Sequence, residues 1–99
     1  MNIRINSIHF DASEDLKRLI EKKTSKLEKY YDGILTCEVY LKVVKPETNE
    51  NKHVEIKIYV PNQELFAEKT ADSFEIAIDE VLEALTRQVK KYKEKIKAL

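Results

Sequence analysis

Basic side chains recur at helical spacing in two segments of the chain, and this spacing is the clearest sign of a chemical role. The first segment carries Arg18, Lys22, Lys26 and Lys29, and Lys23 lies beside them. The second segment, the last thirteen residues, carries Arg87, Lys90, Lys91, Lys93, Lys95 and Lys97 against one acid, Glu94. Cations repeated every three or four residues form a stripe along a helix that can hold phosphate groups. A solvated helix end, with bases that suit the helix dipole, explains the second stripe alone equally well.

The formal net charge of the 99-residue chain is zero, which by itself argues against a nucleic-acid partner. The distribution of charge changes this argument. Residues 1–31 carry seven bases and five acids, residues 32–86 carry five and twelve, and residues 87–99 carry six and one. The basic end could therefore face phosphates while the acidic middle balances the total charge. Two basic helices lying side by side would merge their stripes into one surface, which favours RNA as the partner.

The sequence offers little support for catalysis or metal binding. His9 and His53 are far apart, Cys37 occupies an inward position of a predicted strand, and no spacing resembles a zinc site or a nucleophile with its base. A single glycine excludes a glycine-rich phosphate loop. We therefore expect no cofactor, no metal and no small-molecule substrate, because an enzyme would need a deep pocket that nothing in the sequence indicates.

The composition predicts one globular domain, residues 1–99, in the cytoplasm. Apolar residues make up 42% of the chain and charged residues 36%, with no repeat and no low-complexity run. No apolar stretch approaches the roughly 18 residues of a membrane span, and the N-terminus lacks the pattern of a signal peptide. Cys37 has no partner for an internal disulfide, which agrees with a reducing compartment.

The first part of the chain predicts a strand followed by a helix. Residues 2–10 alternate between apolar and polar types, although the phase shifts in the last few of them, where a bulge or the end of the strand is expected. Asp11 and Ser13 offer caps for a helix over about residues 13–31. Gly33 is placed to end this helix.

The middle of the chain predicts three further strands. Alternation over residues 37–43 and 54–60 indicates a hairpin, and residues 65–71 indicate a weaker edge strand. Tyr40 and Tyr59 point to the solvent face of the hairpin, where we expect them to oppose each other. A cross-strand pair that covers the sheet explains these tyrosines better than base stacking does. The same face is the basis of a rival hypothesis, a protein-interaction module.

The last element is predicted to be the longest helix. Asp72 or Ser73 caps it, and Glu75 completes a capping-box pattern with Asp72. Apolar residues repeat on one face from Phe74 to Ile96, over about six turns. The resulting order, β-α-β-β-β-α, predicts an α+β fold in which both helices pack on one face of a four-stranded mixed sheet.

Three strings of the sequence resemble the family of ribosome hibernation-promoting factors and ribosome-associated translation inhibitors. These strings are KLEKYYDGI (residues 26–34), VYLKVVK (39–45) and AIDEVLEALTRQVKKYKEKIK (77–97). The resemblance implies a fold akin to the double-stranded-RNA-binding domain. It also implies binding to the 16S rRNA of the small ribosomal subunit, in the channel where messenger RNA and tRNA anticodon arms lie, so that translation is inhibited by steric occlusion.

The resemblance also implies which residues contact rRNA. Matched position by position, the family's rRNA-contacting bases correspond to Lys23, Lys26, Arg87, Lys91, Lys93 and Lys95. Lys22 and Lys90 complete the set of RNA-binding residues that we predict. The chain resembles the short form of the family, which lacks a C-terminal dimerisation domain and needs a separate factor to pair ribosomes. Reversing the charges of Arg87 and Lys91 is expected to abolish ribosome binding.

Overall fold

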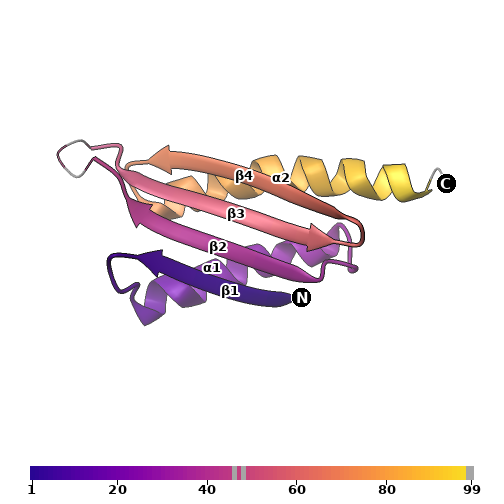
Figure 1. Ribbon diagram of the computed structural model, residues 1–99, viewed down its shortest axis with the longest axis horizontal. Coiled ribbons are helices and arrows are strands. Elements are labelled where there is room, and N and C mark those ends of the chain that lie inside the picture. The colour runs from indigo at the N-terminus through magenta and orange to yellow at the C-terminus, as the bar shows by residue number, and fades with distance from the viewer. Residues whose placement is uncertain (46, 48, 98–99) are drawn as a thin grey trace.

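The computed structural model describes residues 1–45, 47 and 49–97, and within these ranges the predicted order of elements is confirmed (Figure 1). The elements are β1 (Asn2–Ile8), α1 (Glu14–Ser25), the 3-10 helix η1 (Lys26–Lys29), β2 (Thr36–Val43), β3 (Lys52–Val60), β4 (Gln63–Ala71) and α2 (Phe74–Lys97). No helix in the described part of the chain is both long enough and apolar enough to cross a membrane.

The strands lie in the sheet in chain order, β1-β2-β3-β4. β1 pairs with β2 in parallel, whereas β2 with β3 and β3 with β4 pair antiparallel. A parallel pair needs a crossover connection, which α1 supplies. Both helices lie on the same face of the sheet (Figure 1). The predicted α+β fold with a mixed sheet is therefore confirmed, and the other face of the sheet, the outer face, is left without a covering layer.

The core lies between the sheet and the two helices. Alternate residues of the central strands point inward and are fully buried, among them Val39, Leu41, Ile56 and Ile58. The predicted apolar stripe of α2 meets them, and its buried members are Ile78, Val81, Leu85, Val89 and Tyr92. Burying each side chain of this size stabilises the fold by roughly 1.5–3 kcal/mol relative to exposure. This packing fixes which side of α2 faces solvent.

Strand β1 ends without a bulge. Ser7 is half-buried and Ile8 is exposed, so the alternation of the strand continues in phase to its last residue. His9 then has a φ of 63°, in the left-handed region, which turns the chain out of the sheet. Of the two alternatives for this segment, the end of the strand is correct.

The first helix ends earlier than the sequence predicts. The Ser13 hydroxyl accepts a hydrogen bond from the amide of Leu16 at 3.1 Å, so the predicted cap is confirmed. The α-helix stops at Ser25 and continues as the 3-10 helix η1. The Thr24 hydroxyl donates to the Ile20 carbonyl at 2.7 Å. This bond satisfies a buried hydroxyl, and short 3-10 turns such as η1 are frequent at the C-terminal ends of α-helices.

Gly33 does not end the helix as predicted, because its φ is not positive. A side chain at this position would collide with the ring of Tyr31. The Tyr31 ring in turn packs edge-on against Tyr92 of α2, with ring centroids 5.3 Å apart. The glycine therefore provides room for a contact between the end of η1 and α2.

The second helix is capped by Ser73, whose hydroxyl accepts from the amide of Ile76 at 3.2 Å. The predicted capping box between Asp72 and Glu75 is wrong, because with Ser73 as the cap Glu75 occupies only the second helical position. The Glu75 carboxylate lies instead 3.7 Å from the ammonium of Lys23 on α1. This acid therefore helps to join the two helices.

Candidate nucleic-acid interface

Helix α2 divides into an acidic half, residues 74–86, and a basic half, residues 87–97. The acidic half carries four acids and no base, and the basic half carries six bases and one acid. One buried face runs through both halves, and the Tyr92 hydroxyl fixes the basic half to the sheet by donating to the Pro61 carbonyl at 2.9 Å. Burial raises the pKa of Tyr92 above its ordinary value of 10, which agrees with a hydroxyl that keeps its proton for this hydrogen bond. The basic half is therefore a rigid support for its outward lysines.

One flank of the basic half faces the end of the first helix. The ammonium of Lys90 lies 4.8 Å from the centre of the Tyr30 ring, a cation–π contact. Lys93 lines the same surface hollow as Lys29 and Tyr30. Lys26 lines a neighbouring groove that Tyr30 also borders. The structure therefore brings cations of both helices together around Tyr30, so the two stripes merge along this flank of α2 only.

The other flank of the basic half faces the edge strand β4. Lys91 and Lys95 line a hollow there with Gln63 and Leu65 of β4. These two lysines point away from the first helix. The predicted site residues of α2 therefore lie on both flanks of the helix rather than in a single row, and Glu94 lies on the exposed side between them.

Carboxylates of the acidic half pair with two of the predicted site residues. The Lys23 ammonium donates to Asp79 at 2.6 Å, and this hydrogen bond raises the pKa of Lys23. Its side chain is 21% exposed. Arg87 pairs with Glu83 one turn earlier at 3.3 Å, but both side chains are open to solvent. Lys23 therefore holds α1 against α2, and its charge is the most strongly compensated of the predicted set.

The remaining predicted cations have no carboxylate partner in the part of the chain that the structure describes. Within the described residues, no ion pair involves Lys22, Lys26, Lys90, Lys91, Lys93 or Lys95. Lys22, Lys26, Lys90, Lys91 and Lys95 are exposed, and Lys93 is half-buried. Their charges are available to an external anion.

The two tyrosines of the outer face do not oppose each other, contrary to the prediction. The register pairs Tyr40 with Glu55 and Tyr59 with Thr36. Both hydroxyls reach the carboxylate of Glu38, which lies between them. Tyr40 donates to Glu38 at 3.4 Å, and a hydrogen bond to the same carboxylate raises the pKa of Tyr59 to about 12. The tyrosines are thus tied to the sheet surface, which fits the covering role that the sequence favours.

The side chains most often used for catalysis or metal binding lie elsewhere. Cys37 is fully buried, and burial raises the pKa of its thiol to about 12, so it is the core residue that the sequence predicts. His53 is not an isolated surface residue, because the β3–β4 register places it beside Glu55 and Glu68. The sequence alone did not predict this cluster. The sequence shows that His53 and Glu55, two residues apart on a strand, share a face. The pairing of β3 with β4 then places Glu68 beside them.

A family model supports the resemblance found in the sequence. The model described as "Sigma 54 modulation protein / S30EA ribosomal protein" matches residues 3–97, almost the whole chain. The chain belongs to the S30EA ribosomal protein family. The family suggested by the three sequence strings is thereby confirmed.

Named relatives share this S30EA domain over its whole length. The ribosome hibernation promoting factor of Pseudomonas putida is 29% identical over 99 residues, which cover 100% of this chain and 93% of that protein. The ribosome hibernation promotion factor of Staphylococcus aureus is 30% identical over 96 residues, which cover 97% of this chain and 50% of that protein.

Solved structures share the fold of this S30EA domain. The N-terminal domain of Thermus thermophilus Protein Y superposes with a TM-score of 0.82 at 26% identity, covering 93% of this chain and 99% of that one. A ribosomal subunit interface protein from Coxiella burnetii superposes with a TM-score of 0.81 at 25% identity, covering 95% of this chain and 99% of that one. The arrangement of the sheet and helices is therefore that of the family.

Proposed function

We propose that this protein is a ribosome hibernation factor that binds the 16S rRNA of the small ribosomal subunit, in the channel of messenger RNA and tRNA. Three facts support the proposal. The chain belongs to the S30EA family, a relative of matching length is named a ribosome hibernation promoting factor, and a solved structure of the same fold is named a ribosomal subunit interface protein. An occupied channel cannot accept messenger RNA, so translation is inhibited by steric occlusion.

The single observation that carries the docking mode is the set of unpaired lysines on the basic half of α2. An ammonium group without a carboxylate partner is free to neutralise an RNA phosphate, and release of the cations condensed on the RNA then drives binding. Within the described residues, Lys91, Lys93 and Lys95 form no ion pair, although the chain as a whole is neutral. Contacts of this kind recognise the shape and backbone of RNA more than its base sequence.

The first helix contributes a second set of contacts in this proposal. Lys26 and Lys90 both lie near Tyr30, so a phosphate chain that follows the basic half of α2 also meets the end of the first helix. Lys22 is exposed on the same helix. Lys23 contributes least, because binding a phosphate competes with its hydrogen bond to Asp79. Steric occlusion needs no chemical step, so no catalytic residue is assigned.

Charge reversal on opposite faces of the molecule tests the proposal. The variant Lys91→Glu/Lys93→Glu reverses one cation on each flank of α2. Its matched control, Arg4→Glu/Lys57→Glu, makes the same change in net charge on the outer face. We expect the first variant to lose co-sedimentation with small subunits, with affinity lower by at least about a hundredfold, and the control to bind as the wild type does. Equal binding by both variants would refute the docking mode, and circular dichroism checks that both are folded.

A further part of the proposal concerns which residues are sufficient for ribosome binding. We propose that residues 1–99 suffice for binding to the small subunit and that pairing of ribosomes is left to a separate factor. Sucrose-gradient sedimentation of ribosomes mixed with this chain alone tests this, with inactive single ribosomes as the expected product. Paired ribosomes formed by this chain alone would contradict it.

A further inference from the structure

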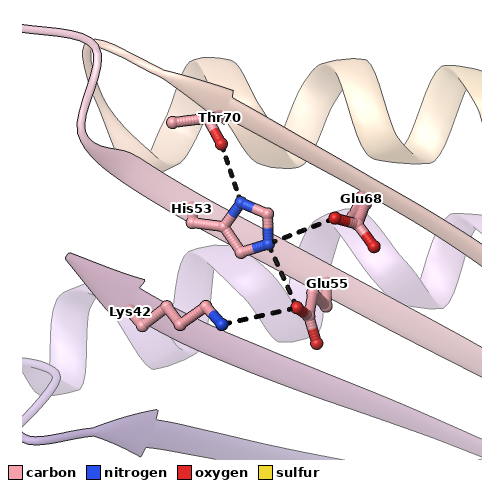
Figure 2. Close-up of polar contacts among 5 residues, drawn as sticks. All are labelled: Lys42, His53, Glu55, Glu68 and Thr70. Atoms are coloured by element: carbon pink, nitrogen blue, oxygen red, sulfur yellow. Dashed lines mark hydrogen bonds and ion pairs between the residues drawn. The ribbon is translucent and has the colours of Figure 1, made fainter. Parts of the chain in front are cut away.

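Three potential metal ligands lie together on the outer face of the sheet, away from both helices (Figure 2). His53 and Glu55 are two residues apart on β3, so their side chains point to the same face. Glu68 lies directly opposite Glu55 on β4. Because two hydrogen-bonded strands hold the three residues, the fold itself fixes their spacing.

The distances between the ligand atoms suit a small divalent ion. The Nε2 atom of His53 lies 3.1 Å from Oε1 of Glu55 and 3.6 Å from Oε1 of Glu68. One ligand atom from each of the three residues falls within 4.8 Å of the others. In a tetrahedral zinc site with bonds of about 2.1 Å, the ligand atoms are about 3.4 Å apart. Only small side-chain rotations would therefore be needed to admit the ion.

The other ring nitrogen of His53 is already oriented. Its Nδ1 atom lies 2.7 Å from the Thr70 hydroxyl, and Thr70 is the cross-strand neighbour of His53 on β4. The His53 side chain is only 12% exposed, so the ring is held in place. Metal-bound histidines characteristically use the nitrogen that is not a ligand for such a contact, which fixes the ring and directs the free nitrogen to the metal. Here that free nitrogen points between two carboxylates.

The local charge also favours a cation. Glu55 and Glu68 are directly opposed on neighbouring strands, and like charges in this arrangement are destabilising. Lys42 on β2 lies 3.7 Å from Glu55 and compensates one of the two carboxylates. The carboxylate side chains are 30% and 51% exposed, so an ion can enter from solvent and retain a water molecule.

We propose that His53, Glu55 and Glu68 bind one Zn²⁺ ion, which joins β3 to β4 on the outer face and keeps a water molecule as its fourth ligand. One imidazole nitrogen with two carboxylate oxygens suits zinc, whereas Mg²⁺ and Ca²⁺ prefer oxygen ligands alone. Among the described residues, this is the one group of three or more His, Cys, Asp or Glu side chains with such spacing. The site lies on the opposite face of the sheet from the helices and does not depend on rRNA binding.

Calorimetric titration of tag-free, chelator-treated protein with zinc chloride tests the proposal. We expect one zinc ion per chain and a rise in the melting temperature that increases with zinc concentration. The variants His53→Gln and Glu68→Gln should each weaken binding by at least about tenfold. Two controls should bind as the wild type does: Glu64→Gln, which removes a carboxylate from the same strand and face, and His9→Gln, which removes the other histidine.

The position of the ion is checked by NMR of the histidine ring protons, where zinc should shift the His53 signals and leave those of His9 in place. Absence of saturable zinc binding would overturn the proposal. So would binding that His53→Gln and Glu68→Gln leave unchanged, or binding that His9→Gln removes. Because the helices are not involved, none of these results would bear on ribosome binding.

Discussion

The two halves of α2 share one apolar face but carry opposite charges on their outward sides. In the acidic half, Asp79 and Glu83 pair with cations of this chain, Lys23 and Arg87. In the basic half, lysines on both flanks have no such partner within the described residues. The net charge of the chain is zero, so the total charge does not reveal this difference. Most acids of α2 lie in residues 74–86 and all of its bases in residues 87–97.

The buried face of α2 stabilises the fold, whereas charges on its outward side are available to an external partner. Both halves contribute fully buried residues to the core, Ile78 and Val81 in the acidic half and Leu85 and Val89 on either side of the boundary. Packing therefore constrains both halves in the same way and leaves the outward charges unconstrained. Within the described residues, three of the four acids of the acidic half pair with cations of this chain, whereas the basic half leaves a cationic surface that an RNA phosphate chain could neutralise.

Truncating a side chain of the buried stripe, which runs through both halves of α2, should destabilise the protein strongly. Leu85→Ala truncates a fully buried side chain in the middle of the stripe. We expect a loss of about 2–5 kcal/mol in the free energy of unfolding, measured by denaturant titration, because a cavity remains where the side chain was. A loss below about 1 kcal/mol would mean that α2 is not packed as described. Lys91→Ala, on the exposed side, serves as the control and should change stability little.

Neutralising lysines with and without an internal carboxylate partner tests whether the acids of α2 decide which cations meet rRNA. In Lys91→Gln/Lys95→Gln, the slope of log affinity for small subunits against log salt should become shallower by about 2, one unit for each lost phosphate contact. In Lys23→Gln the slope should change by less than about 0.5, because Asp79 already compensates that charge. Binding assays at several salt concentrations measure both slopes. Equal changes per lysine in the two variants would show that internal pairing does not decide which cations meet rRNA.

The ion pair of Lys23 also predicts a small difference at high pH. Its hydrogen bond to Asp79 raises the pKa of Lys23 above the ordinary 10.5. The folded state therefore holds its proton more tightly than the unfolded state does. This contribution to stability is present below about pH 10 and is lost as the pH rises through the raised pKa. Lys23→Met should lose less stability than the wild type above pH 10.5, whereas Lys91→Met should follow the wild type. Chemical unfolding from pH 8 to 12 tests this, and identical profiles for all three proteins would count against it.

The smallest expected effect concerns the outer face, which the rival hypothesis of a protein-interaction module uses. Tyr40→Ala/Tyr59→Ala removes both rings and leaves α2 unchanged. Co-sedimentation with small subunits should stay within about twofold of the wild type, because neither ring lies on the helical side that carries the unpaired lysines. A loss comparable with that of the charge reversals on α2 would favour the rival hypothesis.

Local periodicity made most of the fold predictable from the sequence. The inward residues of β2 and β3 and the stripe of α2 follow spacings of 2 and 3.6 residues, which are visible without any tertiary contact. The end of the first helix was not predictable in this way. Residues 26–29 continue the helical spacing of the sequence, yet in the fold they wind as the 3-10 helix η1.

The sequence predicted which basic residues belong to the candidate site, but not how these residues are arranged or which of them form ion pairs. The sequence revealed the basic stripes, yet the pairing of Lys23 with Asp79, 56 residues further along the chain, depends on how the two helices pack together. Likewise, the separation of Tyr40 from Tyr59 and the meeting of His53 with Glu68 depend on strand register. A shift of register by one residue would reverse which side chains share a face. Alternation alone cannot decide such pairings.

Lysine footprinting can show which cations of the protein lie against the small ribosomal subunit. The protein, free and bound to small ribosomal subunits, is acetylated briefly, and the reactivity of each lysine is measured by mass spectrometry. We predict that Lys90, Lys91, Lys93 and Lys95 lose reactivity several-fold in the complex, while Lys57 on the outer face reacts as it does in the free protein. Protection of Lys57, with the lysines of the basic half still reactive, would contradict the account.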